Sequence, residues 1–341
     1  MTGARTVADL GERELIARIR AGVGTLPAWV RVGLGDDAAV IEPVKRALEV
    51  VTTDALVEGV HFDRACSPAR DIGAKALAVS LSDLAAMGAT PRAALLSLGL
   101  PADLDLADFD ALLSGFVEAA ARHKVAIVGG NIARSPGPLF VDVTATGAVH
   151  VRKALTRGGG RPGDALYVTG RPGAAAAGLA WLRRRAAGEQ AQDRDPEVLH
   201  EAVARHSRPE PRVRLGVLVG RSRAASACID LSDGLGDAVR QMAEASGVGA
   251  VVDLAAVPWH PAAAAFWPDE PERLVRALAS DDYELLFAVP PRKRRAFDAV
   301  TLRPGGPPVT RIGRLTAERE ILVQRDDGEP LAMPAGYAHF A

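Results

Sequence analysis

The stretch Val50-Val-Thr-Thr-Asp-Ala-Leu-Val-Glu-Gly-Val-His61 joins an apolar run to two hydroxyls, a carboxylate and then a histidine. Its β-branched valines favour a strand, and the apolar run predicts that this strand is buried. The oxygens of Thr52, Thr53 and Asp54 would then form a polar strand end that suits a hard cation such as Mg²⁺. Local chemistry alone favours a turn or a helix cap for these three residues, so the metal hypothesis depends on other segments.

Length and composition indicate a globular protein of two domains. The 341 residues exceed the usual size of one hydrophobic core. A hydrophobic share of 48% and a charged share of 24% argue against extensive disorder. The formal net charge of -1 and the aromatic share of 4% disfavour nucleic-acid partners and anionic membranes.

The cysteines and the amino terminus favour a cytoplasmic protein. Cys66 and Cys228 have no metal-binding spacing and do not suggest a disulfide scaffold. The first residues contain no apolar signal core, and no run of about 18 apolar residues follows that could span a membrane.

In the first half of the chain, helical and strand patterns are mixed. We expect helices over residues 11–20, 67–87 and 104–123, and strands over 93–98, 125–128 and 139–149. The strand at 125–128 is expected to stop at Gly129-Gly130-Asn131. Paired glycines there would let the backbone approach phosphate oxygens closely, although a tight turn is the simpler alternative.

Acids recur at the ends of these elements. Asp36 and Asp37 follow two glycines, and at most one of them faces a given site; an exposed turn explains them equally well. Asp83 lies on the helix face of Ile72 and Val79, near a helix end whose dipole opposes its charge. Either a bound metal or an ion pair with a distant Arg would compensate Asp83.

The second half begins after a segment rich in helix and strand breakers, between residues 149 and 162. Asp230 ends an apolar strand, while Ser232 and Asp233 precede a helix and have the chemistry of an N-cap. No Lys in the chain follows a Gly, so a Walker-type phosphate loop is absent. We expect strands over residues 165–169, 251–254, 285–289, 309–314 and 321–324, and helices over 173–184 and 235–246.

Carboxylates at strand and helix ends are the feature that the two halves share. If several of them met without counterions they would repel strongly, so a common site requires several cations. Multiple Mg²⁺ ions suit phosphoryl transfer, in which catalysis consists mostly of positioning and of neutralising phosphate charge.

An ordered set of motifs resembles the thiamine-monophosphate kinase family, of the aminoimidazole-ribonucleotide synthetase-like superfamily. The motifs are Gly35-Asp-Asp-Ala-Ala39, Thr53-Asp54 with His61-Phe62, Leu81-Ser-Asp-Leu-Ala-Ala-Met-Gly-Ala89, Ala154-Leu-Thr-Arg157, Asp230-Leu-Ser-Asp-Gly-Leu235 and Asp282-Tyr-Glu-Leu285. The resemblance implies an α+β fold of two domains, residues 1–150 and 151–341, each a mixed sheet packed with helices. It also implies a homodimer formed by the first domain and a nucleotide cleft between the domains.

By this resemblance the protein would move the γ-phosphoryl group of ATP to thiamine monophosphate, with several Mg²⁺ ions. Asp83, Asp230 and Arg157 would serve the transfer itself, and Asp36 would support the metals. Mg²⁺ would be held by Asp37, Thr52, Thr53, Asp54, Asp83, Asn131, Asp230 and Asp233. ATP would contact Gly130, Asn131, Arg157 and Ser232, and the thiamine site would include His61, Glu284 and Tyr337.

The chemistry of the acceptor agrees with the lack of an obvious catalytic base. A phosphate with a second pKa of about 6 is largely ionised at neutral pH, so its attacking oxygen needs no general base. Tyr337 would stack on the cationic thiazolium, and Glu284 would hydrogen-bond the aminopyrimidine or offset the ring charge.

One residue departs from the pattern of the family. Asn131 follows the paired glycines where Asp is common, so one Mg²⁺ contact keeps an oxygen but loses a charge. This departure motivates one alternative, a nucleotide-binding protein that has lost catalysis. The other alternative is a different ATP-dependent enzyme of the same superfamily; a selenophosphate synthetase is disfavoured because no Cys precedes Cys66.

Overall fold

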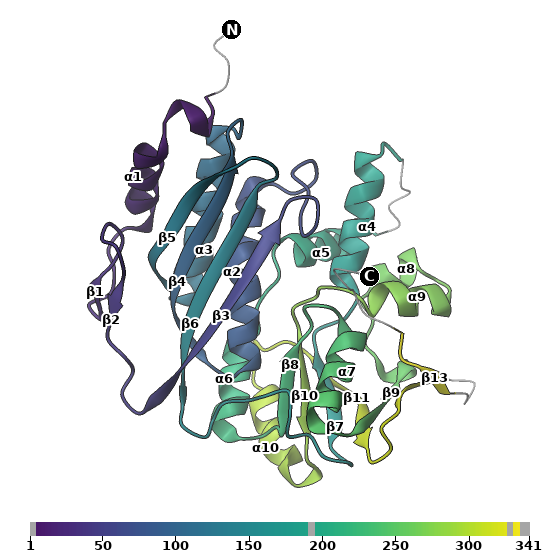
Figure 1. Cartoon of the computed structure of the whole chain (residues 1–341). Helices are drawn as coiled ribbons and strands as arrows, with labels where there is room; N and C mark the ends of the chain where they lie inside the picture. The colour runs from purple at the N-terminus through teal and green to yellow at the C-terminus, as the bar shows by residue number, and fades with distance from the viewer. Residues whose placement is uncertain (1–4, 190–194, 326–329, 335–341) are drawn as a thin grey trace. The chain divides into compact units, whose positions relative to one another are not determined.

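The computed structural model describes residues 5–189, 195–325 and 330–334. The chain divides into two compact units, which are Met1–Leu84 with Thr90–Val149, and Ala85–Ala89 with His150–Ala341 (Figure 1). The last turn of the helix that contains Asp83 therefore groups with the second unit, which the sequence did not indicate.

The first unit is a sheet with two long helices on one face (Figure 1). Among the described residues, four strands pair in the order β3-β6-β4-β5, with β4 parallel to β5 and antiparallel to β6. The elements are η1 (Val7–Asp9), α1 (Glu12–Val23), β1 (Val30–Val32), β2 (Val40–Ile41), β3 (Ala47–Val57), α2 (Ala69–Ala86), β4 (Thr90–Pro101), α3 (Leu106–His123), β5 (Ala126–Ser135) and β6 (Phe140–His150).

Helices α2 and α3 pack unusually closely because glycines lie at their contact. A Cβ on Gly73 would lie 1.9 Å from the carbonyl oxygen of Leu112, and one on Gly115 would lie 1.8 Å from that of Arg70. Leu112 and Phe116 beside these glycines are 1% and 0% exposed, so the helix pair and the sheet enclose a dry core.

The other face of the sheet is covered in part, where Leu26, Trp29, Val30, Ala39 and Ile41 pack on Ala93, Ala126 and Val128 of β4 and β5. Strand β6 shows the two faces by alternation. Val141 and Val143 are fully buried, whereas Phe140, Asp142 and Thr144 between them keep some exposure. We call the face that carries Phe140, Asp142 and Thr144 the open face of the sheet.

Two expectations about this unit are wrong. Strand β3 does not end at Thr52-Thr53-Asp54 but runs through them to Val57, and it is not fully buried, because Val51 on the open face is 63% exposed. Strand β5 does not stop at the paired glycines, because its ladder with the 12-residue strand β4 continues to Ser135. Only glycine fits at position 130 of this ladder, because a Cβ there would lie 1.9 Å from the backbone oxygen of Leu96.

The second unit is a mixed sheet with helices on both faces. In the part that the structure describes, seven strands pair in the order β13-β12-β9-β11-β7-β10-β8. The elements are β7 (Ala165–Thr169), α4 (Ala174–Ala186), α5 (Pro196–Ser207), α6 (Val213–Ser222), β8 (Ala227–Asp230), α7 (Leu235–Ser246), β9 (Gly249–Asp253), η2 (Leu254–Ala256), α8 (Pro261–Phe266), α9 (Glu270–Ala277), β10 (Leu285–Val289), η3 (Pro291–Lys293), α10 (Arg294–Thr301), β11 (Val309–Thr316), β12 (Ile321–Gln324) and β13 (Pro330–Ala332).

Alternation along β7 divides the side chains between two cores. Leu166 and Val168 pack into one core with α7, and Tyr167 packs into the other with Phe297 of α10. Strands with both faces covered read as continuous apolar runs, which is why β7 and β10 agree with the expected ranges. The expected α+β class with a mixed sheet in each unit is confirmed.

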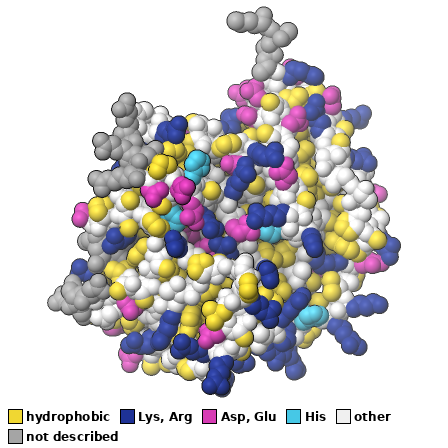
Figure 2. All heavy atoms as spheres, turned by 180° about the vertical axis from the view of Figure 1, so that it is seen from behind, with side chains coloured by type: hydrophobic (Ala, Val, Ile, Leu, Met, Phe, Trp, Pro, Cys, Tyr) yellow, Lys and Arg dark blue, Asp and Glu magenta, His cyan; other side chains and the backbone are white. Residues whose placement is uncertain are grey.

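The surface carries charges of both signs. On the face in Figure 2, acidic side chains lie between basic ones, as expected from a formal net charge of -1. Over the described residues, no helix has the length and apolarity that a membrane crossing needs.

Candidate functional site

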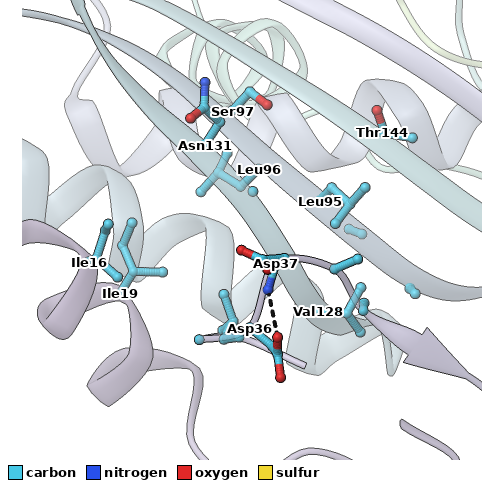
Figure 3. Close-up of a pocket in the computed structure, with 18 of the residues that line it drawn as sticks. Ile16, Ile19, Asp36, Asp37, Leu95, Leu96, Ser97, Val128, Asn131 and Thr144 are labelled. Atoms are coloured by element: carbon cyan, nitrogen blue, oxygen red, sulfur yellow. Dashed lines mark hydrogen bonds between the residues drawn. The ribbon is translucent and has the colours of Figure 1, made fainter. Parts of the chain in front are cut away.

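A pocket of about 670 Å³ lies in the first unit, between helix α1, the loop of residues 34–39 and the sheet (Figure 3). Ile16, Ile19, Leu95 and Val128 give it an apolar wall. Its polar lining comes from segments that the sequence singled out, namely Asp36, Asp37, Gly129, Gly130 and Asn131, together with Glu12, Ser97, Thr144 and Thr146. The pocket thus combines an apolar wall with carboxylates and close-packed backbone.

The two adjacent acids of this pocket have different roles. The backbone N–H of Asp37 donates to Oδ1 of Asp36 over 2.9 Å, which braces the turn (Figure 3). The carboxylate of Asp36 therefore supports the loop conformation. Its expected support of metal ligands stays a prediction. Both residues are exposed.

A second group of acids lies where β3 faces helix α2. The hydroxyl of Thr52 donates to the carboxylate of Asp83, and the hydroxyl of Ser80 hydrogen-bonds Asp54. Burial first, and then the charges of Asp83 and Asp142, raise the pKa of Asp54 to about 6 against this hydrogen bond. Oδ2 of Asp54 is buried without a hydrogen-bond partner among the described residues.

An orphaned carboxylate oxygen beside a second acid fits a cation. Burying such an atom costs free energy unless a donor or a metal ion satisfies it, and oxygen ligands of this kind suit Mg²⁺. Thr52, Asp54 and Asp83 therefore have the chemistry that the metal hypothesis requires.

Thr53 points to the opposite face of the sheet from Thr52 and Asp54. Its hydroxyl donates to Oδ2 of Asp142 over 3.4 Å and lies 3.2 Å from the hydroxyl of Thr144. The expected single polar corner is thus divided between two faces, because successive side chains of a strand alternate.

Asp142 is an acid that the sequence analysis missed. On β4, Ser97 pairs with Asp142 on one side and with Asn131 on the other, so these three residues form a row across the sheet. The alternation Phe140-Val-Asp-Val-Thr144 was a signal that Asp142 faces away from the core. The pairing of β6 with β3 and β4, which the sequence does not reveal, makes this acid relevant.

His61 has a defined tautomer. The backbone N–H of Val57 donates to Nδ1 of His61 over 3.1 Å. In the neutral ring the proton therefore lies on Nε2, which is assigned from the hydrogen bond and makes Nε2 a donor.

In the second unit, Asp230 is the last residue of β8 and is only 4% exposed. Ser232 and Asp233 follow it, and their side chains lie 3.4 Å apart from Oγ to Oδ2. The N-cap of α7 is Gly234, without a side-chain cap, so the N-cap alternative for Ser232 and Asp233 is wrong. Arg157 lies at the surface, and its guanidinium donates to the side-chain oxygen of Gln241.

Glu284 lies in the interior, 3% exposed. Its carboxylate accepts from the guanidinium of Arg212 through Nε and Nη2 and from the hydroxyl of Thr169. Its contact with a substrate stays a prediction, and Tyr337 lies outside the described residues.

The predicted acids come together in small groups. Within the ranges that the structure describes, no three His, Cys, Asp or Glu side chains form a metal-binding group. Asp54 with Asp83 and Asp36 with Asp37 belong to the first unit, and Asp230 with Asp233 to the second.

Family models identify both halves of the chain. Residues 35–149 match the model of the AIR synthase related protein N-terminal domain, and residues 161–325 match that of the C-terminal domain. The thiamine-monophosphate kinase of Escherichia coli (strain K12) is 42% identical over 334 residues, which cover 97% of this chain and 98% of that relative.

Solved structures agree with these matches. The thiamine-monophosphate kinase of Stenotrophomonas maltophilia K279a is 36% identical with a TM-score of 0.80, covering 94% of this chain and 98% of that one. AaThiL complexed with AMPPCP and TMP is 29% identical with a TM-score of 0.74, covering 100% of each chain. Fold and matches together define an AIR synthase-related protein. Within that class the chain belongs to the thiamine-monophosphate kinase family, a family of phosphotransferases.

Proposed function

We propose that the protein transfers the γ-phosphoryl group of ATP directly to thiamine monophosphate, giving thiamine diphosphate. The observation that carries the proposal is the likeness over the whole chain to AaThiL, which was solved with AMPPCP and TMP. The pocket with its paired glycines and acids supports an anionic ligand accompanied by cations.

Several Mg²⁺ ions, when bound, would neutralise the charge of the phosphates that must meet. The orphaned oxygen of Asp54 is the observation that fits a cation best. We assign the ions to both units, with the ligands Asp37, Thr52, Thr53, Asp54, Asp83, Asn131, Asp230 and Asp233.

We assign the contacts with ATP and with thiamine monophosphate to two further groups of residues. We assign the ATP phosphates to Gly130, Asn131, Arg157 and Ser232. His61 would donate from Nε2 to the substrate, because Val57 already donates to Nδ1. Tyr337 would stack on the thiazolium. Glu284 is also assigned to the thiamine site.

The transfer itself would need positioning more than proton abstraction. The acceptor phosphate is largely ionised at neutral pH, so its oxygen can attack in line without a base. Arg157 would offset the repulsion between the two anions, and Asp83 and Asp230 would fix the geometry of the reacting groups.

We further propose that the open face of the first unit forms a homodimer. Val51 and Phe140 lie on this face outside the pocket lining and are 63% and 37% exposed. Apolar side chains collected on one sheet face favour burial against a partner of similar character.

We also propose that the protein works in the cytoplasm. Its two cysteines, Cys66 and Cys228, form no disulfide with each other, as is usual in a reducing compartment.

One assay tests the proposed function. Purified protein is incubated with ATP, Mg²⁺ and thiamine monophosphate, and thiamine diphosphate is followed by chromatography. Product that depends on all three components supports the kinase. Nucleotide binding without product would favour a protein that has lost catalysis, and ATP turnover only with a different acceptor would favour another enzyme of the superfamily.

A further inference from the structure

The second unit contains a buried ion pair whose Glu284 hydrogen-bonds Leu231, the neighbour of Asp230 and Ser232 in the sequence. The guanidinium of Arg212 donates to both carboxylate oxygens of Glu284, from Nε over 2.7 Å and from Nη2. The two side chains are 11% and 5% exposed. Thr169 completes the arrangement, because its hydroxyl donates to Glu284 and accepts from the N–H of Leu285 over 2.8 Å.

Glu284 ends a segment, Ser280-Asp-Asp-Tyr-Glu284, which is fixed at several points. The carboxylate of Asp282 accepts from the N–H groups of Gly173 and Ala175 over 2.7 and 2.9 Å. The hydroxyl of Ser280 accepts from the N–H of Ala176 over 2.9 Å. This segment therefore caps the start of α4 with two side chains.

Tyr283 between these residues has a left-handed backbone. Its φ is 50°, which costs free energy for a residue with a bulky side chain. Such a conformation persists only where neighbouring contacts fix it, and here the side chains on both sides of Tyr283 are engaged.

The same segment holds Leu231 by its backbone. Tyr283 donates its N–H to the oxygen of Leu231 over 3.1 Å, and Leu231 donates its N–H to the oxygen of Glu284 over 2.9 Å. Leu231 is fully buried in the core beneath α7. Its neighbours in sequence are Asp230 and Ser232.

The turn that follows packs against the same chain segment. Gly236 donates its N–H to the oxygen of Leu278 over 3.2 Å. A Cβ on Gly234 would lie 2.0 Å from that oxygen, and Gly234 has a φ of 93°. Residues 230–236 are thus attached at both ends to residues 278–284.

We propose that Arg212, Glu284 and Tyr283 are positioning residues that fix Leu231 and thereby direct Asp230, Ser232 and Asp233 toward the metal-bound nucleotide. The inference rests on the proposed function. The ion pair fixes the position of Glu284, and the left-handed backbone of Tyr283 turns the chain of residues 280–284. The two backbone hydrogen bonds of Leu231 with Tyr283 and Glu284 then fix the position of Leu231. Alternation along β8 turns Asp230, its last residue, away from the core that receives Ile229 and Leu231, and Ser232 and Asp233 follow in the turn.

The test removes both charges together. Losing one partner alone would leave an unpaired buried charge and risk unfolding, whereas two apolar side chains of similar length are usually tolerated. For Arg212→Met combined with Glu284→Met, we expect a folded protein whose affinity for Mg²⁺-AMPPCP, measured by calorimetry, falls about 10- to 100-fold. Without any ligand, hydrogen exchange at the amide of Leu231 should become faster.

A matched control uses the exposed pair Arg294 and Asp298, 3.7 Å apart, in the same unit. Arg294→Met combined with Asp298→Met should change neither measurement. If the Arg212 and Glu284 double variant keeps its nucleotide affinity and its Leu231 protection within twofold, the proposal is wrong.

A second variant keeps the proposal testable should the double variant not fold. Arg212→Lys keeps the charge but not the two-pronged hydrogen bonding, so about a tenfold loss of nucleotide affinity is expected. Unchanged affinity and unchanged protection of Leu231 in this variant would overturn the proposal. Since neither measurement uses thiamine monophosphate, failure of the proposed function in the wild type would be a separate result.

Discussion

The hydroxyl of Thr52 on β3 donates a hydrogen bond to the carboxylate of Asp83 on α2. This contact joins an edge strand to the helix behind it and fixes the orientation of an acid near the helix end. Asp54 lies beside the pair, and its buried Oδ2 has no hydrogen-bond partner among the described residues.

Replacing Asp83 should remove activity without unfolding the protein. Asp83→Asn keeps the size of the side chain and can still accept from Thr52, but it removes a charge from the proposed metal set. We expect turnover to fall at least about 100-fold, while the melting temperature stays close to that of the wild type. Activity near the wild-type level would exclude Asp83 from the metal ligands.

The Mg²⁺ requirement should depend on pH through Asp54. Burial and neighbouring charges raise the pKa of this carboxyl to about 6, so below pH 6 it is mostly protonated and a cation must displace the proton. We expect the half-saturating Mg²⁺ concentration to rise as the pH falls from 7 to 5. Initial rates across a Mg²⁺ series at each pH measure this change.

Asp54→Asn provides the control for that experiment. An amide cannot titrate in this range, so the variant should need more Mg²⁺ at every pH and should show a flatter pH profile. An equally steep profile in the variant would assign the titration to another group.

Restoring the acid at position 131 should lower the Mg²⁺ requirement. Asn131 lines the pocket and lies in one row with Ser97 and Asp142. Asn131→Asp adds a charge to a ligand oxygen, so we expect half-saturation at a lower Mg²⁺ concentration, by about tenfold. If the Mg²⁺ dependence of turnover did not change, Asn131 would not belong to the metal set.

Close packing of α2 on α3 should make Gly115 intolerant of a side chain. A Cβ there would lie 1.8 Å from the backbone oxygen of Arg70, so Gly115→Ala should lower the free energy of unfolding by about 1–3 kcal/mol or more. Gly22→Ala in α1 is the matched control, because its Cβ would meet a side chain at an ordinary 3.5 Å. Urea denaturation of both variants checks the contrast, since Gly22→Ala should be neutral or slightly stabilising.

Local patterns predicted the elements that depend on local chemistry. The apolar runs at 165–169 and 285–289 and the amphipathic helix at 235–246 agree with β7, β10 and α7. Helices α5 and α6 were missed, because the charged stretch before 196 and the Arg-rich stretch near 214 obscure their apolar spacing. For β5, tertiary pairing with β4 overrode the breaking tendency of Gly129-Gly130.

The residues of the candidate site also differ in whether local sequence patterns could predict them. Motif chemistry selected Asp37, Asp54, Asp83 and Asp230, but it selected neither Asp142, for which strand alternation indicated only an outward direction, nor Arg212. Asp142 depends on the order of strands, and Arg212 depends on a contact with Glu284 across 72 residues of chain. A contact between residues so far apart in the chain cannot be predicted from a local sequence pattern.

The alternation within β3 makes the length of the chain before it critical. Thr52 and Asp54 face α2 while Thr53 faces Asp142, so sliding the strand by one position would exchange these partners. A deletion of one residue between β2 and β3 that is absorbed by such a slip would present Asp54 to the carboxylate of Asp142. Insertions and deletions in this short connection should therefore be selected against more strongly than substitutions, although the connection itself carries none of the proposed ligands.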